Sequence, residues 1–363
     1  MIEEFYKKFK IRDYMDDNVL REQSLENIID CSLGTNDFID ENKIKSYILK
    51  SNYELNKYPL IEYELLKEEI IKFWSDYTYL KLKKSNIAFG AGIMGTLRNM
   101  SEFLINENTK VLGCAPQFPR FISEIELKKG IYDYYDMGKK NNFKFIVDDF
   151  INKLTQKYDV IHIENPNNPT GQIIDIDDIE KIVKKVRKNE SIVIIDEAYG
   201  EYMENKNSAI RLVEKYDNVV VLRSASKFYG LPNHRVGYLV ASEWFIKIYN
   251  EITIPFPFSD LSANVYRNIL KNHKEMEYSK QRIIDIKKKM LKVLKKENYL
   301  YTDMQTPILT VKSNKYENLS NELRRKGIIT ENCITFLNLD SRYARIRIPQ
   351  KWQNLLKVLN DVL

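Results

Sequence analysis

The sequence predicts an α/β fold in which a mostly parallel sheet lies between helices, followed by a smaller α+β domain. Between about residues 87 and 240, short apolar runs alternate with amphipathic stretches long enough to form crossover helices. One such stretch, Asp175 to Lys188, carries apolar residues at helical spacing. The seven runs predicted to be strands begin at Ile87, Val111, Ile131, Val160, Ile192, Val219 and Val236.

The pattern changes after residues 254–258, where Pro255 and Pro257 mark a boundary. A lysine-rich helix is expected from about His273 to Glu297, with its lysines on a solvated face, and shorter strands and helices follow. The expected domains are a large one over residues 36–255 and a small one formed by residues 1–35 and 256–363.

The composition indicates a soluble globular protein. Its 57 basic and 51 acidic residues are interleaved along the chain, so the net charge of +6 describes a solvated surface and not a nucleic-acid footprint. The start lacks the apolar core of a signal peptide, and no later apolar run reaches the roughly 18 residues of a membrane span. Cys31, Cys114 and Cys333 form no CxxC pair. We therefore expect a cytoplasmic protein with no nucleic-acid partner, no membrane association and no metal site.

The first motif that could carry chemistry is Asn165-Pro-Asn-Asn-Pro-Thr-Gly171, which follows an apolar strand and precedes a helix. Its prolines and glycine fix a rigid turn. That turn would hold Asn167 and Asn168 at the carboxyl edge of the sheet, where open α/β sheets bind ligands. An isolated NPxG would favour a plain turn, but this longer string does not stand alone.

A second motif is the apolar strand that begins at Ile192 and ends in Asp196, with Tyr199 three residues further on. A carboxylate beyond a buried strand could be a metal ligand, a helix cap or the partner of a cation. The residues of this motif alone leave these alternatives open.

The third motif runs from Val219 through Ser224, Ser226 and Lys227 to Arg235. Most lysines of so lysine-rich a chain lie on the solvated surface. Here, however, the lysine stands between a buried strand and a glycine-punctuated turn, which places it near the other strand ends. This position indicates a nucleophilic lysine.

Together these motifs resemble the class I/II aminotransferases of the aspartate-aminotransferase fold type, and most closely the histidinol-phosphate aminotransferase-like branch. The resemblance covers nearly the whole chain. The matching segments are Tyr58-Pro59, Gly90 to Gly95, Pro116 to Phe118, Asn165 to Gly171, Asp196 to Tyr199, Ser224 to Gly237 and Ala344 to Ile346. It implies fold type I of the transferases that depend on pyridoxal 5′-phosphate (PLP), with Lys227 holding the cofactor as a Schiff base.

The resemblance also implies a role for each cofactor contact. Asp196 would bind the ring nitrogen, Asn168 and Tyr199 the phenolic oxygen, and Phe118 the ring face. Lys227, Asp196 and Tyr199 are the expected catalytic residues. The expected phosphate contacts are Gly92, Ile93, Met94, Ser224, Ser226 and Arg235, joined by Tyr58 from the neighbouring subunit of a homodimer.

For the substrate, the resemblance implies that Arg345 pairs with the α-carboxylate and that Asn36 belongs to the loop covering the substrate. Arg347 is the rival candidate, because two residues along a strand share a face. The implied reaction is ping-pong transfer of an amino group between an amino acid, or an amine such as histidinol phosphate, and a 2-oxo acid. The alternatives are a decarboxylase resembling threonine-phosphate decarboxylase and a non-catalytic PLP-binding sensor.

Three departures from the family pattern concern the substrate and cofactor contacts. Ile93-Met94-Gly95 replaces a small acidic pair at the phosphate loop, so main-chain contacts are expected there. Asn233-His234 replaces the usual Gly-Leu before the arginine, and we expect His234 to be a hydrogen-bonded structural residue. The segment from Leu33 to Phe38 lacks the usual Asn-Pro of the covering loop.

Overall fold

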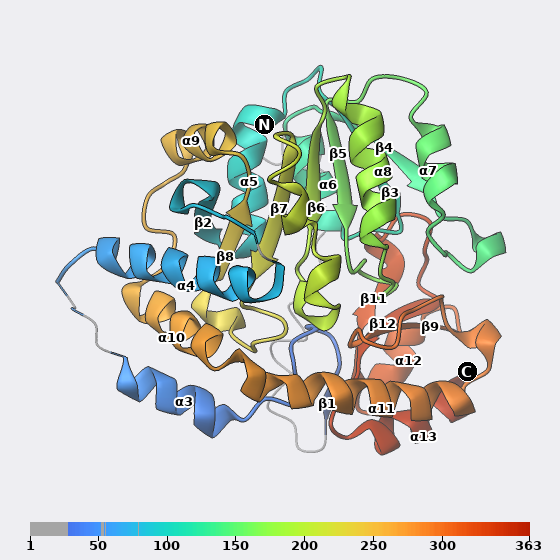
Figure 1. The fold of residues 1–363 in the computed structure, drawn as a ribbon. Coiled ribbons are helices and arrows are strands. Elements are labelled where there is room, and N and C mark those ends of the chain that lie inside the picture. Colours follow the sequence, from blue (N-terminus) through green and yellow to red (C-terminus); the bar gives the residue numbers. More distant parts are fainter. Residues whose placement is uncertain (1–27, 52–53, 55, 79) are drawn as a thin grey trace, which may run out of the picture.

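The computed structural model describes residues 28–51, 54, 56–78 and 80–363 (Figure 1). The seven strands of its main sheet are β2 (Ile87–Ala91), β3 (Lys110–Ala115), β4 (Ile131–Asp136), β5 (Val160–Glu164), β6 (Ile192–Asp196), β7 (Val219–Ser224) and β8 (Val236–Val240). They lie in the order β2-β8-β7-β6-β5-β3-β4. Neighbours pair in parallel, except that β8 runs antiparallel to β2 and β7. The seven predicted strands and the mostly parallel sheet are confirmed.

Helices cover both faces of this sheet (Figure 1). Along β6, Val193 and Ile195 join one apolar core while Ile194 joins the other, as the two-residue period of a strand requires. The helices around the sheet are α4 (Leu60–Thr78), α5 (Gly92–Leu104), α6 (Pro119–Leu127), α7 (Val147–Lys153), α8 (Ile176–Arg187), α9 (Glu243–Ile252) and α10 (Asp260–Lys271), and α3 (Glu41–Lys50) packs against α10. Side chains of α4 and α8 belong to the first core, and side chains of α5, α6 and α9 to the second.

Helix α8 shows why these segments become helices. Asp175 caps its start by accepting a hydrogen bond from the backbone N–H of Asp177, and Ile179, Ile182 and Val186 are buried on one face. The predicted helix is therefore confirmed. Within the described part of the chain, none of the helices combines the length and the apolar character that crossing a membrane requires.

The C-terminal part forms a second, smaller unit of structure. Its antiparallel sheet has the order β11-β12-β9, and helices lie beside it (Figure 1). The elements are β9 (Ile308–Lys312), β10 (Ile328–Ile329), β11 (Glu331–Asn332), β12 (Tyr343–Arg347), α11 (Glu277–Val293), α12 (Leu319–Arg325) and α13 (Trp352–Val362). Strand β1 (Ile29–Asp30) pairs with β10, which brings the chain near residue 30 to the C-terminal part.

The division into domains stays a prediction. Helix α10 follows the proposed boundary at residue 255 and yet packs against α4 beside the main sheet. The first 27 residues, which the prediction assigns to the small domain, lie outside the described residues.

The lysine-rich helix differs from the prediction. Its α-helical part is α11, Glu277–Val293, and short 3-10 turns stand on either side. Lys288 and Lys289 are exposed, but Lys287 is fully buried, so the expectation of a solvated face is wrong for Lys287. Its Nζ lies within hydrogen-bonding distance of five oxygens. These are the carbonyl oxygens of Asp303, Thr306 and Ile308 at 2.6, 3.1 and 2.7 Å, and the hydroxyl oxygens of Thr302 and Thr306 at 2.7 and 3.1 Å.

Candidate active site

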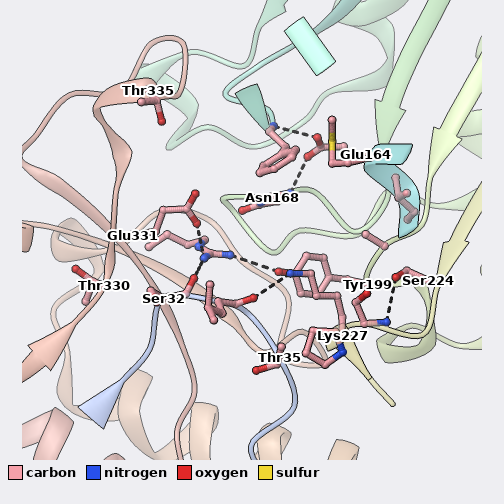
Figure 2. A pocket seen from close by; sticks show the side chains of 18 of the residues that line it. Ser32, Thr35, Glu164, Asn168, Tyr199, Ser224, Lys227, Thr330, Glu331 and Thr335 are labelled. Atoms are coloured by element: carbon pink, nitrogen blue, oxygen red, sulfur yellow. Dashed lines mark hydrogen bonds and ion pairs between the residues drawn. The ribbon is translucent and has the colours of Figure 1, made fainter. Parts of the chain in front are cut away.

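A cavity of about 540 Å³ lies at the carboxyl edge of the main sheet (Figure 2). Strands β5, β6 and β7 end there at Glu164, Asp196 and Ser224, and all three residues line the cavity. Because β8 runs in the opposite direction, its start at Val236 reaches the same edge and brings Arg235 with it. The volume suits a small ligand, for which sites of roughly 300–1,000 Å³ are usual.

Two walls enclose this cavity. The sheet wall consists of residues at the strand ends and in the loops that follow them, and it includes Lys227. The C-terminal wall lies opposite. It includes Ser320, Arg324, Thr330, Glu331, Thr335 and Arg345. Ser32, Leu33 and Thr35 reach the cavity from the segment after β1 (Figure 2).

Lys227 lies in the loop between β7 and β8, with its amine at the cavity. Its Nζ donates to the carbonyl oxygen of Leu33 at 2.9 Å and lies 5.5 Å from the centre of the Tyr199 ring. The backbone of the loop is fixed from outside, since the N–H of Asn36 donates to the carbonyl of Lys227 at 3.0 Å. The amine is therefore held near the Tyr199 ring by a hydrogen bond to a backbone carbonyl, which a ligand can replace.

Two buried carboxyl groups stand side by side on the sheet wall. Asp196 and Glu164 are register partners on β6 and β5. Asp196 accepts from the N–H of Ala198 at 2.9 Å, while Glu164 accepts from the N–H groups of Phe118 at 2.9 Å and Asn168 at 3.0 Å. Burial raises the pKa of Asp196 to about 7, and burial together with the charge of Asp196 raises the pKa of Glu164. A cationic group placed beside Asp196 would therefore be favoured.

The turn from Asn165 to Gly171 gives its two central asparagines different tasks. Asn167 holds the turn together, because its Oδ1 accepts from the Thr170 hydroxyl at 2.6 Å and its Nδ2 donates to the carbonyl of Pro116 at 3.2 Å. Asn168 lines the cavity, and its buried Oδ1 has no hydrogen-bond partner within the described residues. An unsatisfied buried acceptor of this kind is costly unless a ligand supplies the donor.

A tight backbone approach forms one end of the cavity. Gly92 has a φ of +70°, which favours glycine, and a Cβ added there would lie 2.4 Å from Nη2 of Arg235 and would displace the guanidinium. The guanidinium of Arg235 is held by the carbonyls of Pro232 at 3.0 Å and Ala91 at 3.2 Å. Arg235 itself has a φ of +55°, which directs the chain into β8.

Helix α5 begins beside this guanidinium. Ile93 and Met94, in its first turn, line the cavity together with Ser224 and Ser226. The hydroxyl oxygen of Ser224 accepts from the N–H of Ser226 at 3.0 Å, which fixes the short loop before Lys227. Free N–H groups at a helix N-terminus, hydroxyls and an arginine together make a site suited to an anion such as phosphate.

The structure separates the two arginines of β12. Arg345 is buried and lines the cavity, where its Nη1 donates to the hydroxyl oxygen of Tyr199 at 3.3 Å. Arg347 does not line the cavity and instead pairs with Asp37 at 3.0 Å and donates to the carbonyl of Asp30. Of the two candidates for a carboxylate contact, Arg345 is therefore the one in position.

Three predicted site residues, Gly92, Asn36 and Tyr58, are not among those that line the cavity of this chain. Asn36 is buried elsewhere, and its Nδ2 donates to the carbonyl of Phe228 and the hydroxyl of Ser279, both at 2.9 Å. Tyr58 is 74% exposed, and its ring stacks on Phe256 with 4.5 Å between the ring centres. Asn36 thus anchors the segment leading away from the cavity, while Tyr58 projects from the surface of the chain.

His234 also lies outside the cavity lining. Its Nδ1 makes a hydrogen bond with the hydroxyl of Ser262 at 3.1 Å, which is the structural arrangement that the sequence predicted. Burial lowers its pKa.

Sequence reasoning missed two acids of the cavity. Glu164 could have been predicted from the sequence, because it ends the apolar run before Asn165 in the same way that Asp196 ends the run that begins at Ile192. Glu331 had none, since β11 is two residues long and carries no periodic pattern. Glu331 faces Arg345 across β11 and β12 and forms an ion pair with it (Figure 2).

Comparisons with known proteins agree with this geometry. The family described as Aminotransferase class I and II matches residues 28–359 of the chain. Histidinol-phosphate aminotransferase 1 of Archaeoglobus fulgidus is 30% identical over 324 residues, which cover 86% of this chain and 93% of that protein. Histidinol-phosphate aminotransferase of Methanococcus aeolicus is 29% identical over 345 residues, covering 93% and 91%.

Solved structures share the fold. Histidinol-phosphate aminotransferase of Clostridium acetobutylicum has a TM-score of 0.80 at 20% identity, with 92% of this chain and 98% of that chain covered. The Sinorhizobium meliloti enzyme of the same name, solved in complex with PLP, has a TM-score of 0.80 at 16% identity, with 98% of both chains covered. The chain therefore belongs to the class I and II aminotransferases, and it is a PLP-dependent aminotransferase of fold type I.

Proposed function

We propose that the cavity is the active site of this aminotransferase and that Lys227 is the residue that bonds to PLP. There the enzyme would move an amino group between an amino acid, or an amine such as histidinol phosphate, and a 2-oxo acid. The observation that supports this most strongly is that Lys227, Asp196, Asn168 and Tyr199 converge on one cavity from the ends of three different strands and the loops after them.

The residues of the cavity fit PLP. Asn168 offers a buried acceptor without a partner among the described residues, which suits a phenolic hydroxyl, and Tyr199 can contact the same oxygen. The carboxyl group of Asp196 favours a protonated ring nitrogen, and Phe118 lines the cavity where it can cover the ring. The residues that would hold the phosphate are Gly92, Ile93, Met94, Ser224, Ser226 and Arg235.

When bound, PLP supplies an aldehyde that reacts with primary amines and a ring that accepts electrons. The side chains of this chain supply the rest. The amine of Lys227 would take the proton from the α-carbon of the substrate, acting as general base at that atom. Arg345 would orient the substrate by a two-pronged contact with its carboxylate. The buried residues of both walls limit the access of water.

A test of this proposal combines two measurements. Borohydride reduction of the enzyme loaded with PLP should fix the cofactor on Lys227, which peptide mapping would detect, and Lys227→Ala should show no such adduct. Initial rates with varied donor and acceptor should give the parallel lines of ping-pong kinetics. A modified lysine elsewhere would overturn the assignment, and release of CO2 without a keto product would favour the decarboxylase.

We further propose that the enzyme works as a cytoplasmic homodimer in which Tyr58 reaches the phosphate site of the partner subunit. The exposed ring of Tyr58, packed on Phe256 at the surface, supports this proposal. Sedimentation at the concentrations of the assay would test it. An active monomer, or a Tyr58→Phe enzyme with unchanged affinity for PLP, would contradict it.

A further inference from the structure

Glu331 and Arg345 form a buried ion pair on the C-terminal wall of the cavity. They stand opposite each other in the antiparallel pair of β11 and β12, so the backbone fixes their approach. Both residues line the cavity, and 9% of Glu331 and 3% of Arg345 remain exposed. The guanidinium also donates to the carbonyl of Ser32 and to the hydroxyl of Tyr199. Much of the positive charge of Arg345 is therefore already compensated.

The pair leaves one acceptor unused. Oε2 of Glu331 contacts Arg345, while Oε1 is buried and has no hydrogen-bond partner within the described residues. A buried carboxylate oxygen without a donor is unfavourable, and a charged donor satisfies it better than a neutral one. Figure 2 shows Glu331 on the opposite side of the cavity from Lys227 and Ser224.

We propose that Glu331 selects amino substrates whose side chain carries a positively charged hydrogen-bond donor, such as an ammonium or a guanidinium group. This inference rests on the function proposed above and names its substrate class. The α-carboxylate would take the outer face of Arg345, and the distal cation would reach Oε1 of Glu331. A substrate with a second anionic group would place that charge beside the buried carboxylate of Glu331, and the two negative charges would repel each other.

The C-terminal wall also contains Arg324 and several hydroxyl groups, which could receive a phosphate. A phosphorylated substrate is therefore the competing outcome. Glu331 favours the cationic substrate, because its carboxylate lies beside Arg345, the residue proposed to orient the substrate.

The experiment compares near-isosteric pairs that differ in charge, L-arginine with L-citrulline and L-lysine with L-norleucine. O-phospho-L-threonine and histidinol phosphate are the phosphorylated probes. The first readout is the change in the cofactor absorbance of the holoenzyme in the half-reaction. The second is the dissociation constant measured by calorimetry on Lys227→Ala protein loaded with PLP, which reports binding without turnover.

The wild-type enzyme should prefer the charged member of each pair by roughly 10- to 100-fold, as expected for a hydrogen bond to a buried charge. Glu331→Gln should bring this ratio close to one, and Glu331→Asp should keep part of it. A ratio near one in the wild type, or a preference for the phosphorylated probes, would overturn the inference. An equal loss for all probes in Glu331→Gln would do so as well, because it would mean that Glu331 merely positions Arg345.

The wild-type ratio needs no variant, so the inference can be tested even if Glu331→Gln fails to fold. The proposed function fails separately, when none of the amino compounds changes the cofactor absorbance. If L-norleucine reacts as well as L-lysine, the proposed transamination is supported, and the proposed role of Glu331 in substrate selection is wrong.

Discussion

The two walls of the cavity differ in how their side chains are placed. On the sheet wall, Asp196 and Ser224 end strands of five and six residues that are paired on both sides. On the C-terminal wall, Glu331 begins a strand of two residues. The rigid wall therefore suits the fixed demands of a cofactor, whereas the other wall can vary with the substrate. Substitutions on the sheet wall should abolish chemistry, and those on the C-terminal wall should change substrate affinity.

The largest effect on activity is expected from Lys227→Ala. Loss of the amine removes both the covalent attachment and the base at the α-carbon, so kcat should fall by roughly 10³-fold or more. Lys288→Ala, which changes an exposed lysine of α11, is the matched control and should leave kcat unchanged. If Lys227→Ala kept a tenth of the wild-type rate, the proposed role of the sheet wall would be lost.

Asp196→Asn should lower kcat by about 100-fold, because an amide cannot stabilise a protonated ring nitrogen as a carboxylate does. In the cofactor-free protein, by contrast, we expect Asp196→Asn to increase the stability of the fold at neutral and higher pH. Burial raises the pKa of Asp196 from 3.8 to about 7, so its contribution to stability is present below about pH 4 and is lost as the pH rises to 7.

Differential scanning fluorimetry of the cofactor-free protein measures this effect. Asp196→Asn should raise Tm by roughly 2 °C or more at pH 8, with little change at pH 4. A lower Tm at pH 8 would show that the carboxylate is not destabilising in the folded state.

A smaller effect on activity is expected on the C-terminal wall. Arg345→Lys keeps the charge and loses the planar fork, so KM for the amino substrate should rise about tenfold with a smaller change in kcat. Arg347→Lys is the matched control, because it alters the neighbouring arginine that pairs with Asp37 outside the cavity. Equal effects of the two changes on KM would contradict the assignment of Arg345.

The sequence predicts the sheet wall far better than the C-terminal wall for a physical reason. Apolar runs of five or six residues predict a buried strand. The polar residue that ends each run then lies at the carboxyl edge of the sheet, where ligands bind. Asp196 could be found in this way, and Lys227 and Asn168 lie in the loops directly after such runs. Glu331 could not be found in this way, because its place in the cavity depends on pairing with a strand that begins twelve residues later.

Two further features could not be predicted from local pattern. Asn36 resembles a residue of a substrate loop, but its side chain is fixed by Phe228 and Ser279, which are about 190 and 240 residues away in the chain. Lys287 lies in a helix with several exposed lysines, and its side chain is buried because the loop that contains Asp303 and Thr306 contacts it. Contacts between distant segments determine the positions of both side chains, and a short-range sequence pattern cannot predict such contacts.

The smallest effect on activity is expected from Lys287→Met, although this lysine is more buried than Lys227. Thr306, whose hydroxyl and carbonyl oxygens both accept from Lys287, also donates to the carbonyl of Gly171 at 2.6 Å. Through Thr306, Lys287 thereby stabilises the contact between the C-terminal part and the turn that contains Asn168. Methionine fills similar space but removes the donor that these buried oxygens share, so we expect a loss of about 2–4 kcal/mol in stability.

That loss should appear as a lower midpoint of urea unfolding while kcat and KM at 25 °C stay within about twofold of the wild type. Burial lowers the pKa of Lys287 to about 7, so the wild-type protein should gain stability as the pH rises from 7 toward 10, and Lys287→Met should lose this slope. A large fall in kcat would mean that the contact made through Thr306 sets the position of Asn168 during the reaction. The two walls would then act as one unit, because a residue touching neither ligand site would control the chemistry of both.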